Sequence, residues 1–197
     1  MKKIFILTLF LIFSLANLNI AYSISPDVFI QSTVNRASQV LSENISKEEK
    51  IKKLKMIAKE TVDIRGVGFY SLGSARKNLN NEQKITYSNL FESYFLKSFS
   101  SRLAEYTNPE IEVMGKEILN KNYTIVNSIL VSTAERPEVK IDWRVYTKDP
   151  NNPLIRDLII EGLSLARTQK EEFSSILNSN DDNINILFKI LEDFSKD

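Results

Sequence analysis

Two carboxylates in the C-terminal third of the chain are its best candidates for acid–base chemistry. Asp157 and Glu161 fall in an apolar, alternating segment that predicts a β-strand, where an even spacing places both side chains on one face. Paired carboxylates of this kind cleave glycosidic bonds. Charges at the edge of a strand are the commoner reason for such a pair, so we assign no catalytic residue here.

Two absences exclude most other catalytic chemistry. The chain contains no Cys, which rules out thiol nucleophiles, disulfides and thiolate metal sites. It also contains no His, which rules out the usual Ser-His-Asp triad and His-ligated zinc or iron. A catalyst would have to rely on Asp, Glu, Lys, Tyr or Ser alone. We therefore predict a protein that is not an enzyme and needs neither cofactor nor metal.

A glycine-rich segment at residues 63–76 is the other feature that resembles a site. It holds three of the five glycines, Gly66, Gly68 and Gly73. No strand is predicted before it, and its spacing fits neither the dinucleotide fingerprint nor the phosphate loop. We expect a bend with short helical turns here instead.

The N-terminus reads as an export signal. Lys2 and Lys3 precede an apolar run of about a dozen residues, shorter than the ~20 needed to span a membrane. Ala21-Tyr22-Ser23 then provides a small-x-small cleavage site, and Ser25-Pro26 begins a helix. We predict a signal peptide at residues 1–23 and export of the mature protein across a membrane. An uncleaved N-terminal anchor is the alternative.

The rest of the chain, residues 24–197, is long enough for one sizeable core, so we predict a single domain and a monomer. Without Lys2 and Lys3 it carries 24 basic and 25 acidic residues, a formal charge of −1. This balance gives no reason to expect nucleic acid as a partner. Five lysines between residues 47 and 55 could steer docking, although a solvated helix face is the commoner reason for such a run.

The first half of the mature chain shows helical periodicity. Apolar residues recur every three to four positions over residues 26–43, 47–61 and 81–105. Ser25 precedes the first segment as a predicted N-cap, and Ser46 with Glu49 and Asn80 with Gln83 have the spacing of capping boxes. The first two helices should form a hairpin, and the third presents a broad aromatic face.

The period then changes to two. Strands are predicted at residues 111–114, 123–132, 139–147 and 154–161, with turns at Gly115, at Arg136-Pro137 and at residues 149–153. In the third strand Trp143 and Val145 lie on an apolar face, opposite Asp142 and Arg144. Helical periodicity returns after Gly162. The fold class is therefore α+β, with an antiparallel sheet of about four strands and helices packed on one face.

Three stretches carry a resemblance to a known family. They are Leu72-Gly73 with Arg76 and the following helix with Phe91, Phe95 and Tyr106; the strand Val139-Lys140-Ile141-Asp142-Trp143-Arg144-Val145; and Asp157-Leu158-Ile159-Ile160-Glu161-Gly162-Leu163-Ser164-Leu165. Together they resemble the MlaC family of periplasmic phospholipid-binding proteins, auxiliary components of an ABC transporter. The family usually has Tyr where Trp143 stands and Val where Leu158 and Leu163 stand.

This resemblance implies a soluble carrier that holds acyl chains in a lipid cavity between sheet and helices. It also implies exchange of phospholipid with an inner-membrane ABC transporter complex and an outer-membrane lipoprotein complex, which maintains outer-membrane lipid asymmetry. Because the apolar faces of the long helix, the sheet and the C-terminal helix must meet, we expect these residues to contribute most to the pocket: Phe91, Phe95, Val113, Ile129, Val131, Trp143, Val145, Ile159 and Phe173.

Other interpretations remain open from the sequence. For any one of these nine residues, ordinary core packing is an alternative to lipid contact. For the whole chain, the alternative is an exported adaptor or chaperone that binds peptide in an apolar groove. Bound lipid would favour the carrier, whereas an unpaired sheet edge without an internal cavity would favour the adaptor.

Overall fold

A computed structural model describes residues 23–196 of the chain. The expected signal peptide, residues 1–23, lies outside the described residues except for Ser23. Two antiparallel helices come first, α2 (Pro26–Ser42) and α3 (Lys47–Thr61). The predicted capping box begins α3: the Glu49 amide donates to Ser46 Oγ (3.2 Å) and the Ser46 amide donates to the Glu49 carboxylate (3.3 Å). Ser25 is the N-cap residue of α2, but its hydroxyl donates to Asp27 instead of accepting a helix amide.

The glycine-rich segment forms short helices, as predicted. They are α4 (Ile64–Ser71) and the 3₁₀ turn η1 (Ala75–Lys77). The long helix α5 (Asn81–Leu103) follows, and its capping box joins Asn80 to Gln83 in both directions (2.8 and 3.0 Å). Capping satisfies amides that have no partner inside the helix, which fixes where each helix begins.

The strands form one antiparallel meander, β1 (Ile111–Asn120), β2 (Tyr123–Leu130), β3 (Val139–Tyr146), β4 (Leu154–Ile160) and the two-residue β5 (Leu163–Ser164). The prediction of a turn at Gly115 is wrong, because β1 continues to Asn120. The register shifts by one residue between Val113 and Gly115. The glycine therefore marks a β-bulge and not a chain reversal, a role glycine often has inside strands.

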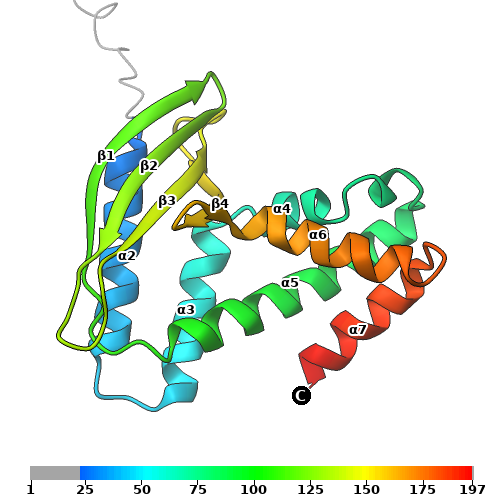
Figure 1. The fold of residues 1–197 in the computed structure, drawn as a ribbon, viewed down its shortest axis with the longest axis horizontal. Helices are drawn as coiled ribbons and strands as arrows, with labels where there is room; N and C mark the ends of the chain where they lie inside the picture. Colours follow the sequence, from blue (N-terminus) through cyan, green and yellow to red (C-terminus); the bar gives the residue numbers. More distant parts are fainter. Residues whose placement is uncertain (1–22, 197) are drawn as a thin grey trace, which may run out of the picture.

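The chain ends with α6 (Leu165–Asn178) and α7 (Ile184–Lys196). The α+β prediction is confirmed, with β5 as a short fifth strand beyond the four expected. The sheet curves around α2, while α4, α6 and α7 extend from the β4 side (Figure 1). The helices α3 and α5 pack on each other and join these two parts of the molecule.

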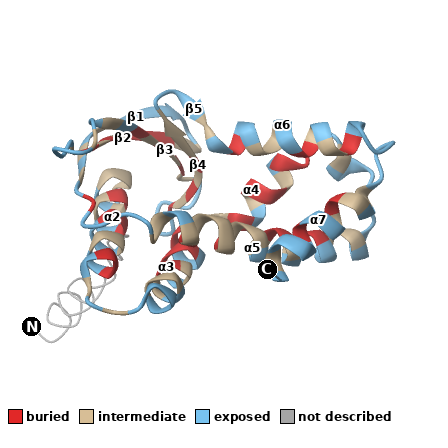
Figure 2. Ribbon diagram, turned by 60° about the horizontal axis from the view of Figure 1, so that its bottom comes forward, coloured by how far each residue is buried: buried red, intermediate tan, exposed pale blue. Residues whose placement is uncertain are grey.

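Burial divides the interior into two main apolar clusters (Figure 2). The sheet cluster lies between α2 and the inner face of the sheet, and its buried members are Ile30, Val34, Val126, Leu130, Ile141, Trp143, Val145 and Ile155. The helical cluster lies among α3 to α7, and its buried members are Ala58, Ile64, Val67, Leu72, Leu79, Tyr87, Phe91, Leu96, Ala166, Phe173, Leu177, Leu187 and Leu191. A smaller third cluster, around Leu41 and Leu54, holds α2 and α3 together.

Candidate functional site

Phe91 lies at the centre of the helical cluster. Its ring centroid lies within 5.7–6.2 Å of four other aromatic rings, those of Tyr87, Tyr94, Phe95 and Phe173. Spacings of three and four residues place most of these rings on one face of α5, and Phe173 meets Phe91 edge-on from α6. The helices therefore share a continuous aromatic surface.

The hydroxyl of Tyr87 is a polar group inside the helical cluster, and it has a hydrogen-bond partner there. The Tyr87 hydroxyl donates to the Gly68 carbonyl at 2.8 Å, and burial raises the pKa of Tyr87 well above its ordinary value. The tyrosine therefore stays neutral and acts as a hydrogen-bond donor. Gly68 also permits the approach of α4 to α5, since a Cβ at this position would lie 2.7 Å from the Phe91 ring.

The sheet cluster is built around Trp143. Its indole Nε1 donates to Ser128 Oγ (2.9 Å), which donates in turn to the Ile141 carbonyl (2.9 Å). Both polar groups are thus satisfied inside the sheet, so they add no exposed donor or acceptor to its apolar face. Val145 and Val126 beside them are completely buried.

The two clusters meet at the end of α3. The half-buried Val62 packs against both, and it forms a parallel bridge to Ile155 of β4. The Asp63 amide donates to the Ile155 carbonyl (2.9 Å), which extends this contact along the edge of β4. The main chain at residues 62–63 therefore ties the helical part directly to the sheet.

An ion pair reinforces this junction. The Arg156 Nε donates to Asp63 Oδ2 (2.7 Å), and its Nη1 donates to the Tyr123 hydroxyl (2.7 Å). The guanidinium also lies 3.6 Å from the centroid of the Tyr146 ring. These partners, Tyr123 and Asp63, raise the pKa of Arg156 although partial burial opposes the shift. Asp63 further accepts the Gly66 amide at the start of α4, so one carboxylate orients both α4 and β4.

The structure divides the nine predicted pocket residues among several locations. Phe91, Phe95 and Phe173 belong to the helical cluster, and Val113, Trp143 and Val145 belong to or contact the sheet cluster. Val131 follows the end of β2 and is half-buried. Ile129 pairs with Lys140 and Ile159 pairs with Asp142, so both lie on the outer face of the sheet. The expectation that these two isoleucines share a face with Trp143 is wrong.

The misplacement of Ile159 has a definite cause. The pairing of β3 with β4 shifts by one residue between Arg144 and Val145, so that Val145 pairs with Ile155 whereas Trp143 pairs with Leu158. Ile155 and Leu158 therefore both face the core although they are three residues apart. A strict alternation along β4 cannot reveal this bulge. Ile155, Leu158 and Val62 are consequently the junction residues that the sequence reasoning missed.

The candidate catalytic pair is also separated by local geometry. Asp157 lies in β4, is buried, and accepts the Ser164 hydroxyl (2.7 Å) and the Ala166 amide (3.0 Å). Glu161 lies beyond the strand with a positive φ of 48° and accepts the Lys140 amide (2.6 Å). The prediction that both stand on one face of a strand is wrong, and each carboxylate has a local structural role.

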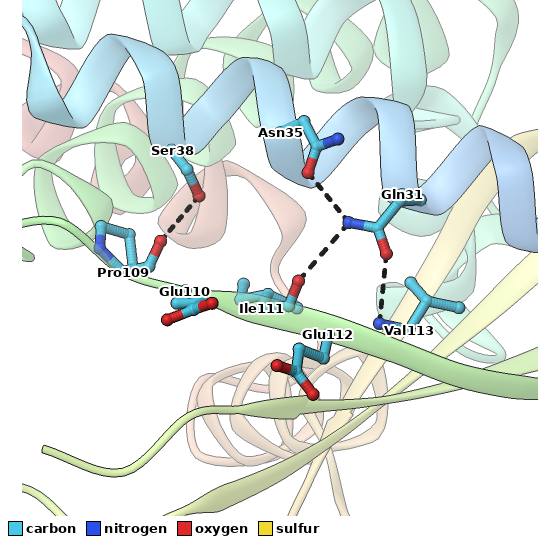
Figure 3. Close-up of a pocket in the computed structure, with 8 residues that line it drawn as sticks. All are labelled: Gln31, Asn35, Ser38, Pro109, Glu110, Ile111, Glu112 and Val113. Atoms are coloured by element: carbon cyan, nitrogen blue, oxygen red, sulfur yellow. Dashed lines mark hydrogen bonds between the residues drawn. The ribbon is translucent and has the colours of Figure 1, made fainter.

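Two hollows open on the surface away from the aromatic cluster. The first, of about 490 Å³, lies between α2 and the free edge of β1 (Figure 3). There the Gln31 amide accepts from the Val113 amide (3.2 Å) and donates to the Ile111 carbonyl (3.5 Å), and Ser38 donates to the Pro109 carbonyl (2.8 Å). Of the nine predicted residues, only Val113 lines it. The second hollow, of about 790 Å³, lies between α4 and α6.

Two further kinds of site are absent within residues 23–196. None of the helices there is both long and apolar enough to cross a membrane. In the same part of the chain, no three acidic side chains gather as a metal ion would require.

Comparisons with known proteins agree with this architecture. A family model described as "MlaC protein" matches residues 31–193 of the chain. Among solved structures, a phospholipid-binding protein from Ralstonia solanacearum, in complex with a phospholipid, superimposes with a TM-score of 0.73. The alignment covers 88% of this chain and 98% of that chain at 17% sequence identity, so it establishes a common fold. No curated protein matches the sequence closely enough to be reported.

Proposed function

This chain belongs to the MlaC family, and from that premise we propose that it is an exported, non-enzymatic carrier of membrane phospholipid. The observation that carries the proposal is the meeting of two apolar surfaces at Val62, one from the sheet and one from the helices. Acyl chains would lie between these surfaces, with the head group towards solvent. The neighbour from Ralstonia solanacearum, a phospholipid-binding protein of the same fold, supports this choice of ligand.

The energetics of the two surfaces favour an acyl chain over a polar ligand. Burying a methylene group is worth about 0.8 kcal/mol, so roughly ten of them supply about 8 kcal/mol without any specific contact to the head group. Asp157 is the one charged side chain buried within residues 23–196, and it is already satisfied by Ser164 and Ala166. The interior therefore offers a ligand apolar contacts but no unpaired charge among the described residues.

The finer parts of the proposal concern location and partners. We propose that residues 1–23 direct export to the periplasm and are removed, and that residues 24–197 act as one lipid-binding domain. The mature protein would carry phospholipid between an outer-membrane lipoprotein complex and an inner-membrane ABC transporter complex, which maintains outer-membrane lipid asymmetry. Membership of the MlaC family and the charged, apolar and small-residue pattern of the N-terminus support this assignment.

The direct test is to purify the chain from Ile24 onward, extract it with organic solvent and identify bound lipid by mass spectrometry. We expect phospholipid at about one molecule per protein. A protein that carries no lipid and takes up none from added vesicles would contradict the proposal. In that case the peptide-binding adaptor becomes the better interpretation.

The only tryptophan of the chain permits a second test, because Trp143 lies in the sheet cluster. Phospholipid with brominated acyl chains should quench its fluorescence by contact, whereas phospholipid brominated only on the head group should not. Equal quenching by both lipids, or by neither, would argue against acyl chains beside the inner face of the sheet.

A matched pair of substitutions separates the two faces of the sheet. Val145→Phe enlarges a side chain on the inner face, and Ile159→Phe does the same on the outer face. Overpacking costs about 1–3 kcal/mol, so folding of each variant is checked by circular dichroism. We expect Val145→Phe to lower lipid occupancy and Ile159→Phe to leave it unchanged. The reverse result would place the lipid on the outer face.

A further inference from the structure

The hollow between α4 and α6 differs in chemistry from both apolar clusters. It is an open depression of about 790 Å³, lined by one aromatic ring, two cations, one carboxylate and several hydroxyl and amide groups. The ring is that of Tyr70 on α4, the cations are Arg167 and Lys170 on α6, and the carboxylate is that of Glu171. This surface can therefore form hydrogen bonds and attract negative charge.

The two cations have no acidic partner within residues 23–196. Neither Arg167 nor Lys170 forms an ion pair there, whereas nine other basic side chains do. The Lys170 ammonium lies 5.6 Å from the centroid of the Tyr70 ring. The charges of Arg167 and Lys170 remain available to a ligand.

The position of Lys170 depends on the backbone of the neighbouring loop. Gly73 adopts a φ of +56°, and a Cβ at this position would lie 3.0 Å from Lys170 Cε. Glycine adopts this positive φ at low cost, whereas the flexible end of Lys170 could move away from an added Cβ. The lysine stem lies against the loop after α4, and its ammonium reaches Tyr70.

The next two turns of α6 supply free hydrogen-bonding groups. Ser174, Ser175 and Asn178 line the hollow, and within residues 23–196 none of their side chains forms a hydrogen bond. Hydroxyl and amide groups without protein partners can form hydrogen bonds with the main chain or a carboxylate of a ligand. The cations lie at one end of this polar row.

From this combination we propose that the hollow between α4 and α6 docks an acidic segment of a partner protein. Carboxylates of the segment would pair with Arg167 and Lys170, and its main chain would lie along Ser174, Ser175 and Asn178. The proposal concerns a protein contact on the outside of the molecule, so it does not depend on which ligand occupies the interior.

The geometry favours a peptide over an anionic membrane surface. A concave hollow admits an extended segment but holds its floor away from a flat bilayer. Surfaces that bind anionic lipid usually carry 4–8 closely spaced basic residues, whereas two cations line this hollow. The hollow at the edge of β1 instead carries Glu110 and Glu112, so the two hollows should not compete for the same segment.

The test uses the mature chain, labelled with ¹⁵N, and a short synthetic peptide of alternating glutamate and serine. We expect chemical-shift changes confined to residues around Tyr70, Arg167, Lys170, Ser174 and Asn178, and binding that weakens as salt is added. A peptide of the same length with glutamine in place of glutamate should bind about tenfold more weakly or not at all.

Charge reversal provides the matched control. The double variant R167E/K170E should weaken binding of the glutamate peptide by about tenfold or more. The double variant K52E/K55E makes the same change of charge on α3, where neither lysine forms an ion pair with any residue in 23–196, and should bind normally. The milder R167Q/K170Q variant replaces R167E/K170E if the reversal impairs folding.

Three outcomes would overturn the proposal. One is a set of shifts scattered over the surface, and another is equal weakening by the α3 control, since either would reflect non-specific attraction. The third is binding to vesicles of anionic phospholipid that depends on Arg167 and Lys170 in the absence of peptide binding, which would assign the hollow to a membrane. Lipid occupancy of each variant, measured by mass spectrometry, separates these results from a failure of the proposed lipid carriage.

Discussion

The sheet part and the helical part of this molecule are stabilised in different ways. In the helical part, aromatic rings on α5 and α6 interlock, and Phe91 alone contacts four of them. In the sheet part the side chains of the inner face are mostly aliphatic, and Trp143 is the one large ring among its buried members. The helical cluster thus depends on ring packing, whereas the sheet depends on the pairing of its strands.

The two edges of the sheet are covered by other parts of the chain. Unpaired main-chain groups at an edge bind other strands readily. On one side the Gln31 amide from α2 satisfies Val113 and Ile111 of β1. On the other side residues 62–63 and β5 cover β4. Polar or main-chain groups thus protect the sheet where apolar packing ends. Gln31 and residues 62–63 lie far from these strands in the sequence, whereas β5 follows β4 directly.

The largest effect should follow from removing the central ring of the helical part. Phe91→Ala should lower the free energy of unfolding by about 3–5 kcal/mol, because Phe91 is 2% exposed and its cavity cannot close around four rings. Two probes show how far the damage spreads. Trp143 fluorescence reports on the sheet cluster, and far-ultraviolet circular dichroism reports mainly on the helices.

The two unfolding transitions should shift together if residues 24–197 form one cooperative domain. Ile85→Ala on the same helix is the control, since Ile85 is 65% exposed and its removal should change stability by less than about 0.5 kcal/mol. A Phe91→Ala variant whose fluorescence transition stays at the wild-type position would show that the sheet part unfolds independently.

A smaller effect is expected at the junction of the two parts. Asp63→Asn removes the charge opposite Arg156 but retains a side-chain oxygen that can accept the Gly66 amide. We expect a loss of about 1.5–3 kcal/mol, the usual contribution of a hydrogen bond to a charged group. Asp63→Ala should cost about 1 kcal/mol more, because it also removes the cap of α4.

The comparison of probes makes this prediction specific. If the junction couples the two parts, Asp63→Asn should separate the midpoint of Trp143 fluorescence from the midpoint of circular dichroism. Coincident midpoints, together with the expected loss of stability, would show that Val62 and the Ile155 main chain suffice for coupling.

Much of this arrangement could be predicted from the sequence, because local signals determine it. Capping residues fixed the start of α3 and α5, and alternation identified the inner face of β3. The bulges in β1 and β4 could not be predicted, since one extra residue reverses the direction of every later side chain while leaving composition unchanged. Ile159 was misplaced for this reason, and Leu158 was missed for the same one.

Contacts between residues far apart in the sequence could not be predicted either. Nothing near Gln31 indicates that its amide reaches β1, 80 residues away. Val62 follows the last turn of α3, so helical periodicity gives it no role, and only the folded chain brings it between both clusters. In the candidate site, neither the face on which Ile129 and Ile159 lie nor the boundary between the two clusters could therefore be predicted from the sequence.

A modest effect is expected at the edge of β1. Gln31→Ala removes the acceptor for the Val113 amide and the donor to the Ile111 carbonyl, which should cost about 1 kcal/mol. Because the loss is local, the Val113 amide should also exchange with solvent faster than in the wild type. Asn35→Ala removes the acceptor for a bond from Gln31 Nε2 (2.9 Å) but leaves both bonds of Gln31 to β1, and it serves as the control. Unchanged exchange at Val113 would mean that Gln31 does not protect the edge.

The smallest effect should come from the ion pair that joins the N-terminal end of α2 to β1. Asp27 accepts from Lys116 (2.7 Å) and from Ser25, and these bonds lower the pKa of Asp27 to about 2. A carboxylate whose pKa falls on folding stabilises the folded state above its unfolded pKa of about 4, and this contribution disappears as the pH falls from about 4 towards 2.

Because both side chains of this pair are more than one-third exposed, solvent screening should limit the contribution to a few tenths of a kcal/mol. Asp27→Asn should therefore be slightly less stable than the wild type at pH 7, and the two proteins should become equally stable near pH 2. Denaturant unfolding between pH 2 and 7 measures this convergence. A difference that stays constant over the whole range would mean that Asp27 contributes through its hydrogen bond to Ser25 and the shape of the helix start, and not through its charge.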